Sequence, residues 1–289
     1  MTRTYRIESQ GNQCFAGRLC TCGSTGGFRQ GNQRKPEAWA SILLPVPEWW
    51  TCRSCATRSR PPKFAADGIC GLRRLNRFAA LVEVAGRQEE VHVRNSGRLH
   101  ELFTPGREVL LEAATTPGRR TRFTLALVRL PTGYVSADAY LPNALVAEGL
   151  QRRAIPGFRR HRILRREPAM GEGRADFLLA NGRRRCLLEV KSVTLVEEGV
   201  ALFPDAPTAR GRTHVEHLIA ARRSGLGAAI LFVIQRSDVR AFAPNQDADP
   251  EFTQALRRAS RAGVRICAMR CRVDPRGVRF TGLVPVRLR

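Results

Sequence analysis

The chain has 289 residues, which is long enough for two compact domains with sizeable cores. Its 49 Lys and Arg residues outnumber 25 Asp and Glu, and a formal net charge of +24 points to a polyanionic partner, nucleic acid ahead of an anionic membrane surface. No apolar run approaches the ~20 residues of a membrane span, and no secretory signal begins the chain, so we expect a cytoplasmic protein without a membrane partner.

The first seventy residues differ in composition from the rest of the chain. They hold six of the nine cysteines and all three tryptophans, and neither helical nor strand periodicity persists in them. Their C-x-C and C-x-x-C pairs can each supply two thiolates to zinc, although about thirty residues separate the pairs. A disulfide framework lacks the support of a secretory signal. We therefore interpret residues 1–70 as a disordered extension or one translated from a start that the cell does not use, with a zinc module as the alternative.

Residues 71–138 show the alternating apolar pattern of short strands. A hairpin is predicted from Phe78 to Val93, and further strands begin near Arg107, Arg122 and Gly133. With one helical turn between 98 and 103, these five strands predict an OB-like β-barrel domain. Barrels of this kind often bind single-stranded nucleic acid.

The loop N-S-G-R in this domain is a candidate phosphate contact. Its glycine lets the backbone approach a phosphate closely while Arg98 contacts the charge, so Asn95 and Arg98 are predicted to bind nucleic acid. The alternative is a helix N-cap followed by a solvated arginine.

Residues 139–289 alternate helical and strand patterns. One helix follows Pro142, a second begins with Thr208 as its N-cap, and a third begins after Asp249. The apolar run from Ala228 to Gln235 is typical of a central strand buried on both faces. The alternation predicts an α/β domain with a mixed sheet and helices on both faces.

Two strands joined by a turn at Asn181 and Gly182 carry the main functional pattern. Asp176 falls near the start of the first strand, whereas Glu189 and Lys191 lie two residues apart in the second and leave the same face of the sheet. Two converging carboxylates can hold a hard divalent cation, and an ammonium beside them can orient or deprotonate a water for phosphodiester hydrolysis. Alternating charges on a strand are also typical of a solvated face.

Lys191 is distinguished further by its residue type. The chain holds three lysines, and from residue 71 onward Lys191 is the only lysine among 39 basic residues. A guanidinium cannot readily lose a proton, whereas a partly buried ammonium can be tuned or can act as a compact point charge. We therefore predict Lys191, Glu189 and Asp176 as catalytic residues, with Mg²⁺ or Mn²⁺ as the cofactor.

Two more polar residues extend this candidate site. Glu167 precedes the Asp176 strand by a loop and could supply a third carboxylate, so the predicted metal ligands are Asp176, Glu189 and Glu167. Gln235 ends the apolar strand, where a polar group often projects into a site, and it joins the predicted catalytic residues.

Basic residues around the carboxylates are candidates for phosphate contacts. Arg174, Arg210 and His214 are predicted to bind nucleic acid. His214 and His217 lie three residues apart, as zinc ligands can, but without a further Cys or His nearby we interpret this pair as helix-surface residues.

Nine short motifs follow one another along the last three quarters of the chain: R-L-N-R-F (74–78), N-S-G-R-L (95–99), P-N (142–143), G-R-A-D-F (173–177), E-V-K-S-V-T-L (189–195), F-P-D-A (203–206), R-G (210–211), H-V-E-H-L (214–218) and L-F-V-I-Q-R (231–236). In these motifs the chain resembles the sugar fermentation stimulation protein A (SfsA) family. The first seventy residues have no counterpart in the resemblance.

The resemblance implies an N-terminal OB-like domain, a C-terminal domain with the PD-(D/E)xK nuclease fold, and non-specific DNA binding. By position, Asp176, Glu189 and Lys191 match the nuclease motif, and Glu167 occupies an acidic position. The chain departs from the family pattern at 94, where arginine replaces a proline, and at 207, where proline replaces an aliphatic residue. Neither departure touches the proposed metal cluster.

Two functions stay open at this point. The first is a DNA-binding protein with a Mg²⁺-dependent nuclease centre. The second is a non-catalytic DNA-binding regulator of sugar (maltose) metabolism genes that retains the nuclease fold. Both predict DNA as the partner, without strong sequence specificity.

Overall fold

Short strands separated by glycine-containing turns build the first domain. The computed structural model describes residues 73–84, 86–114 and 118–288, and the predicted extension at 1–70 lies outside the described residues. The described strands of the first domain are β1 (Arg73–Asn76), β2 (Ala79–Val84), β3 (Arg87–His92), β4 (Val109–Ala113), β5 (Phe123–Leu130) and β6 (Gly133–Ser136).

The β2–β3 pair confirms the predicted hairpin. Its antiparallel register runs from Ala79 opposite His92 to Val84 opposite Arg87. Alternate side chains, including Val82 and Val91, are buried in the core of this domain. The hairpin therefore follows directly from the alternating pattern of the sequence.

The strands of the first domain pair in the order β1-β2-β3-β5-β4, with β6 also paired to β5. β3 and β5 run parallel, whereas the other neighbours run antiparallel. Within the described residues no ladder joins β1 to β4, so hydrogen bonds do not close this OB-like sheet into a complete barrel.

The second domain alternates helices and strands, as predicted. Its helices are α1 (Leu141–Gln151), α2 (Ala209–Arg223) and α3 (Pro250–Arg261). Its main strands are β7 (Arg162–Arg166), β10 (Phe177–Asn181), β11 (Arg184–Val193), β14 (Gly227–Ile234), β16 (Arg265–Asp274) and β17 (Gly277–Val284). In the ranges that the structure describes, none of these helices combines the length and apolar character that a bilayer crossing needs.

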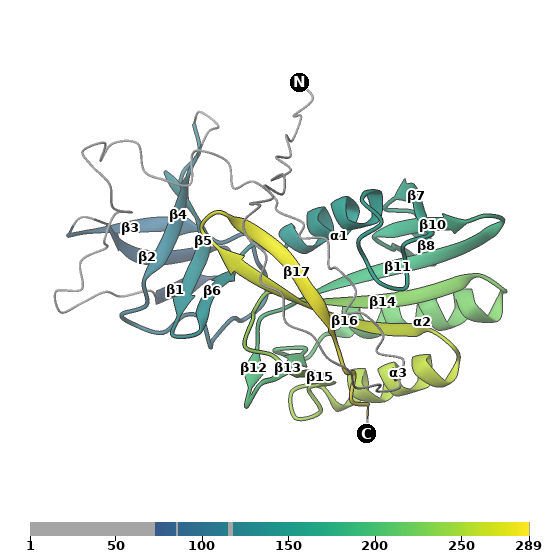
Figure 1. The fold of residues 1–289 in the computed structure, drawn as a ribbon. Helices are drawn as coiled ribbons and strands as arrows, with labels where there is room; N and C mark the ends of the chain where they lie inside the picture. Colours follow the sequence, from purple (N-terminus) through teal and green to yellow (C-terminus); the bar gives the residue numbers. More distant parts are fainter. Residues whose placement is uncertain (1–72, 85, 115–117, 289) are drawn as a thin grey trace, which may run out of the picture.

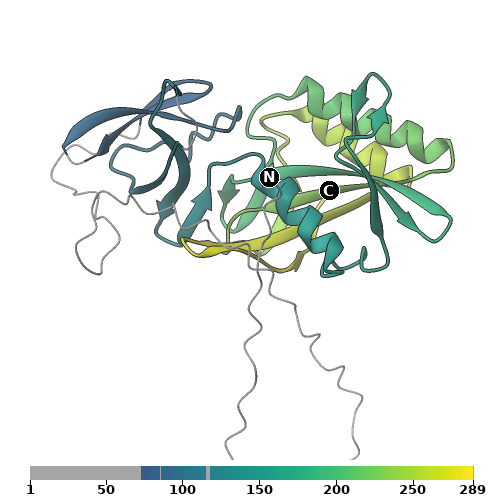
Figure 2. The ribbon, with the colours of Figure 1, turned by 90° about the horizontal axis from the view of Figure 1, so that it is seen from above.

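These six strands form one mixed sheet in the order β17-β16-β14-β11-β10-β7. β11, β14 and β16 run parallel in its centre, and antiparallel strands flank them. α1 covers one face of the sheet, and α2 and α3 cover the other (Figure 2). The predicted α/β domain with helices on both faces is confirmed.

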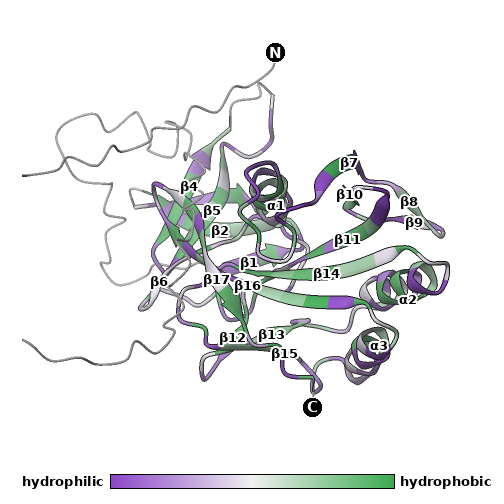
Figure 3. Ribbon diagram, turned by 45° about the vertical axis from the view of Figure 1, so that its right-hand side comes forward, coloured by the Kyte–Doolittle hydropathy of each residue, from purple (hydrophilic) through white to green (hydrophobic). Residues whose placement is uncertain are grey.

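β14 lies in the middle of this sheet and is apolar along its length (Figure 3). Its residues alternate between two buried clusters: Leu231 and Val233 pack on the α1 side, and Ile230 and Phe232 pack on the side of α2 and α3. A continuous apolar run is the sequence signal for such a strand because both of its faces are covered.

The two domains share one apolar core. Leu110 and Leu127 of the first domain belong to the same buried cluster as Val278 and Phe280 of β17. β17 accordingly runs alongside the first domain (Figure 1). Burial of a continuous apolar surface fixes the two domains against each other, which matters because the candidate site lies between them.

Several short elements were not predicted. They are β1, β8 (Ala169–Met170), β9 (Gly173–Arg174), β12 (Val196–Glu197), β13 (Val200–Phe203) and β15 (Ala241–Pro244). Strands of two to four residues carry too little alternation to be recognised from sequence. The β8–β9 hairpin nevertheless covers part of α2 beside the candidate site.

Candidate functional site

The candidate carboxylates lie where β11 extends beyond its neighbour β10. The β10–β11 ladder ends with Phe177 opposite Leu188, whereas β11 continues to Val193 paired with β14 on its other side. Asp176 covers part of the edge that β10 leaves open, because its Oδ2 accepts a hydrogen bond from the backbone N–H of Val190 at 2.7 Å. The turn between the strands thus brings Asp176 to the strand that carries Glu189.

Glu189 is the centre of a buried hydrogen-bond cluster. It is only 3% exposed, and its Oε1 accepts hydrogen bonds from Lys191 Nζ at 2.6 Å and from Nδ1 of His214. The other carboxylate oxygen, Oε2, is buried and has no hydrogen-bond partner. A buried carboxylate oxygen without a donor is costly, and a bound cation is one way to satisfy it.

α2 delivers His214 to this cluster. Thr208 caps the helix, as predicted, by accepting a hydrogen bond from the backbone N–H of Gly211 at 3.0 Å. Farther along, Nε of Arg210 lies 3.5 Å from Nε2 of His214. A carboxylate oxygen can only accept, so Nδ1 of His214 is the donor in its hydrogen bond to Glu189.

The interpretation of His214 as a helix-surface residue is therefore wrong. The imidazole is buried and points at Glu189, because its position on α2 faces β11 and the β8–β9 hairpin covers it. Its neighbour His217 is half-buried beneath the same hairpin, in contact range of Gly171.

Electrostatics distinguish the two carboxylates. Burial raises the pKa of the Asp176 carboxyl above its usual value, and the nearby charge of Glu189 raises it further. Burial also acts to raise the pKa of Glu189, but hydrogen bonds from His214 and Lys191 outweigh it and lower that pKa. Asp176 is held in turn by Asn143 of α1, whose amide donates to Oδ1 at 2.6 Å. Two carboxylates that repel each other beside an unpartnered oxygen fit a hard divalent cation.

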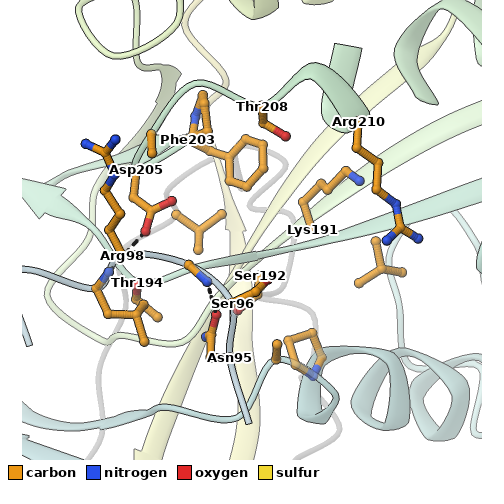
Figure 4. A pocket seen from close by; sticks show the side chains of 18 of the residues that line it. Asn95, Ser96, Arg98, Lys191, Ser192, Thr194, Phe203, Asp205, Thr208 and Arg210 are labelled. Carbon is orange, nitrogen blue, oxygen red and sulfur yellow. Dashed lines mark hydrogen bonds between the residues drawn. The ribbon is translucent and has the colours of Figure 1, made fainter. Parts of the chain in front are cut away.

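These groups open onto a cavity of about 1110 Å³ between the two domains. Its walls come from residues 95–100 of the first domain and from the starts of α1 and α2 in the second. Figure 4 shows Lys191 and Arg210 close together on one side of the cavity, with Arg98 on the other side. The basic residues that line it are Arg74, Arg77, Arg98, Arg174, Lys191 and Arg210, with His100 and His214. A cavity with this lining attracts anionic groups.

The N-S-G-R loop forms part of this wall but uses its backbone differently from the prediction. The N–H of Gly97 donates to Asn95 Oδ1 at 2.8 Å, and the N–H of Leu99 donates to Asp205 Oδ2 of the second domain at 3.1 Å (Figure 4). Two backbone donors of the loop are therefore already occupied. A phosphate contact from this loop would come from the exposed side chain of Arg98, while Asn95 shapes the turn.

Glu167 lines the cavity and lies beside Asp176, since its backbone N–H donates to the backbone carbonyl of Asp176 at 3.0 Å, but its carboxylate is paired with Arg174. Its side chain is 71% exposed and accepts a hydrogen bond from Arg174 at 3.2 Å. Among residues 73–84, 86–114 and 118–288, no group of three or more His, Cys, Asp or Glu side chains is arranged to hold a metal ion. The structure thus brings together two of the three predicted ligands and leaves Glu167 with Arg174 at the edge.

Gln235 lies on the other face of the sheet from Glu189 and Lys191. It follows β14 directly, is fully buried, and donates from Nε2 to the hydroxyl of Ser192 at 2.9 Å. Ser192 lines the cavity, but Gln235 itself does not. The predicted strand-end position is correct, and the side chain reaches the cavity only through Ser192.

Sequence reasoning missed Asn143 altogether, and it named His214 as a nucleic-acid contact without its contact to Glu189. The contact of His214 with Glu189 and that of Asn143 with Asp176 join elements that lie 25 and 33 residues apart in the chain. A signal existed in each case, since both residues fall inside the motifs H-V-E-H-L and P-N. Nothing in the sequence alone assigns either motif to a carboxylate.

Comparison with known proteins agrees with this arrangement of two domains. The model for the SfsA N-terminal OB domain matches residues 72–137, and the model for the sugar fermentation stimulation protein RE domain matches residues 140–277. The chain belongs to the sugar fermentation stimulation protein (SfsA) family. A sugar fermentation stimulation protein homolog from Chloroflexus aurantiacus is 46% identical over 213 residues, which cover 74% of this chain and 82% of the relative.

For two further relatives in the SfsA family, the match to this chain covers most of the relative's length. A homolog from Caldanaerobacter subterraneus is 40% identical over 75% of this chain and 95% of the relative. The solved structure of Pyrococcus furiosus SfsA in complex with Ca²⁺ is similar with a TM-score of 0.70 and 31% identity, and the match covers 76% of this chain and 94% of that one.

Proposed function

We propose that this member of the SfsA family is a nucleic-acid-binding protein with a divalent-metal-dependent nuclease centre. The observation that carries the proposal is the buried Oε2 of Glu189, which has no hydrogen-bond partner while Oε1 of the same carboxylate has two donors. Two donors hold Oε1 in place, and Oε2 is buried without a donor. A cation bound to Oε2 would satisfy this oxygen.

Asp176 and Glu189 would hold the metal, which supplies a Lewis acid for phosphodiester hydrolysis when it is bound. The Ca²⁺ complex of the Pyrococcus furiosus relative supports divalent-metal binding in this family. Mg²⁺ or Mn²⁺ is the cofactor that we propose for this chain, because both ions accept oxygen ligands. Glu167, at the edge of the cavity, could join after its ion pair with Arg174 opens.

The other side chains have separable roles. Lys191 donates to Glu189 and lines the cavity, where its ammonium can orient a water for attack on phosphorus. His214 and Asn143 position the two carboxylates. Arg98, Arg174 and Arg210 supply positive charge for the phosphates of the substrate, which we propose to be DNA.

Cleavage of labelled DNA and RNA, single- and double-stranded, by the full chain with Mg²⁺ or Mn²⁺ tests this function. We expect cleavage that stops when the metal is chelated. Glu189→Gln and Lys191→Ala should each lower the rate by at least the ~10–100-fold typical of changes around a metal site. Glu172→Gln serves as the matched control, because this exposed glutamate does not line the cavity.

A non-catalytic DNA-binding regulator is the second candidate. Two observations favour it: Glu167 is paired with Arg174 rather than with the carboxylates, and the Lys191 ammonium is bonded to Glu189. In the same experiment this function predicts DNA binding by all variants and cleavage by none. Binding that weakens steeply as salt rises is expected for both functions, since both use contacts to phosphates.

A further inference from the structure

Tyr140 is an exposed aromatic residue at the edge of the cavity. It is 73% exposed and lines the cavity next to Asn143. Its backbone is helical, and its N–H donates to Oδ1 of Asp138 at 2.8 Å, so this aspartate satisfies a backbone donor at the start of α1. The Tyr140 ring takes no part in capping and is left in water at the edge of the cavity.

A large exposed ring is locally unfavourable, because its apolar surface stays in contact with water. Departures from local preference without a gain in packing concentrate at functional sites. Because the ring is exposed, packing does not account for Tyr140.

The position of Tyr140 relates it to the carboxylate pair. Asn143 lies three residues later, on the same side of α1, and holds Asp176 through its amide. The ring is thus one helical turn away from the residue that positions a proposed metal ligand. If a phosphate of the nucleic acid binds at Asp176, the base next to that phosphate would lie near the ring of Tyr140.

The depth of the site limits what can reach it. Glu189 is almost completely buried, and both domains contribute walls to the cavity above it. A B-form duplex is a wide, stiff rod. A single strand can turn its bases away from the walls as it enters such a cavity, which favours one strand over a paired duplex at Glu189.

We propose that Tyr140 is a stacking platform for an unpaired nucleobase, and that the cavity takes single-stranded rather than double-stranded nucleic acid. This inference rests on the proposed function for the location of the phosphate. It assigns Tyr140 a binding role and selects one substrate class. Aromatic stacking suits such a role because every base offers a flat face, so no sequence preference is needed.

The test measures binding of the full chain to a single-stranded oligonucleotide carrying 2-aminopurine and to its duplex, in a buffer with a chelator so that no cleavage occurs. Wild type should bind the single strand more tightly and quench its fluorescence. Tyr140→Ala should weaken single-strand binding by about 5- to 100-fold and abolish the quenching, with duplex binding unchanged. Tyr140→Phe, which keeps the ring, should behave as wild type.

The melting temperatures of the variants identify any folding defect, and none is expected because the ring is exposed. Equal single-strand affinity and quenching for wild type and Tyr140→Ala would overturn the inference. Preference of the wild type for duplex would do the same. A wild type that stacks through Tyr140 but never cleaves with Mg²⁺ or Mn²⁺ would support this inference and refute the nuclease, so the two failures are distinguishable.

Discussion

Glu189 and His214 lie 25 residues apart in the chain, yet the imidazole Nδ1 donates directly to the Oε1 of the carboxylate in the interior of the second domain. Lys191 donates to the same oxygen at 2.6 Å. Two donors on one oxygen fix the rotation of the carboxylate and leave Oε2 as its free coordinating atom. We therefore expect His214 to act on the proposed metal site through Glu189.

Removal of this donor should weaken metal binding. We expect His214→Ala to lower the affinity for Mn²⁺ by about 10- to 100-fold, the usual effect of losing a group that orients a ligand. We also expect a loss of about 1–3 kcal/mol in the free energy of unfolding, because a buried carboxylate oxygen loses a donor. Calorimetric titration with Mn²⁺ and urea unfolding measure the two effects.

His214→Asn is the matched variant, since its amide nitrogen can occupy nearly the position of Nδ1. Recovery of most of the Mn²⁺ affinity in this variant supports a positioning role. Equal losses in the two variants would mean that the ring volume matters rather than its hydrogen bond.

The sequence predicted the candidate site in part, because the residues of β10 and β11 are brought together by a local hairpin. A tight turn and a period of two are enough to place Glu189 and Lys191 on one face of β11 and Asp176 near them. The lone lysine at 191 added a reason to regard this face as more than a solvated surface. All three residues meet at the cavity as this pattern implied.

The remaining site residues depend on tertiary packing, which the sequence pattern does not carry. His214 lies on the buried face of α2 with Val215 and Leu218, whose helical spacing indicates that face, but this spacing does not reveal that β11 presents Glu189 opposite it. Gln235 shows the opposite case: its position at the end of β14 was predicted correctly, but the strand's register turns its side chain toward Ser192. The contacts of Glu167 depend on a loop whose backbone no periodicity describes.

Asp205 opposes the positive charge of the cavity. Its carboxylate accepts a hydrogen bond from the backbone of Leu99 and lies on the wall that Arg98 shares. Asp205→Asn keeps an acceptor oxygen but removes one negative charge, so we expect severalfold tighter binding of DNA at low salt. The gain should disappear at high salt, where the charge is screened. Fluorescence anisotropy at two salt concentrations measures it, and a gain that persists at high salt would contradict an electrostatic cause.

Glu101 forms a hydrogen bond between the two domains, and its carboxyl group should make the free energy of unfolding depend on pH. It accepts a hydrogen bond from Thr194, one residue past β11, at 2.9 Å, and burial raises the pKa of its carboxyl above the usual value. A raised folded-state pKa means that its favourable contribution is complete below the unfolded pKa and is lost as pH rises through the folded pKa. The melting temperature of Glu101→Gln minus that of wild type should therefore increase as pH rises from 4 to 8.

Melting curves for both proteins across that pH range check this expectation, with the exposed Glu172→Gln as control. The difference between Glu101→Gln and wild type should be smallest at the acid end, where Glu101 is protonated. A difference that grows toward acid pH would show that the charged form of Glu101 is the stabilising one.

Gly171 and Gly182 offer a matched pair for testing how tightly the β8–β9 hairpin covers α2. Both have a left-handed backbone, with φ values of 58° and 59°. A Cβ at Gly182 would meet nothing within 4 Å, whereas a Cβ at Gly171 would lie 2.6 Å from Nε2 of His217. The two alanine variants therefore share the same backbone strain and differ in one contact.

Gly182→Ala should cost about 1–2 kcal/mol of unfolding free energy, the strain of a left-handed L-residue. Gly171→Ala should cost about 1–3 kcal/mol more, because the half-buried His217 ring must move or the hairpin must lift. Urea unfolding of both variants measures the difference. Equal costs would mean that the hairpin yields freely and does not hold the imidazoles of α2. A larger cost at Gly171 that is accompanied by weaker Mn²⁺ binding would connect the hairpin to Glu189 through His214, which lies one helical turn before His217.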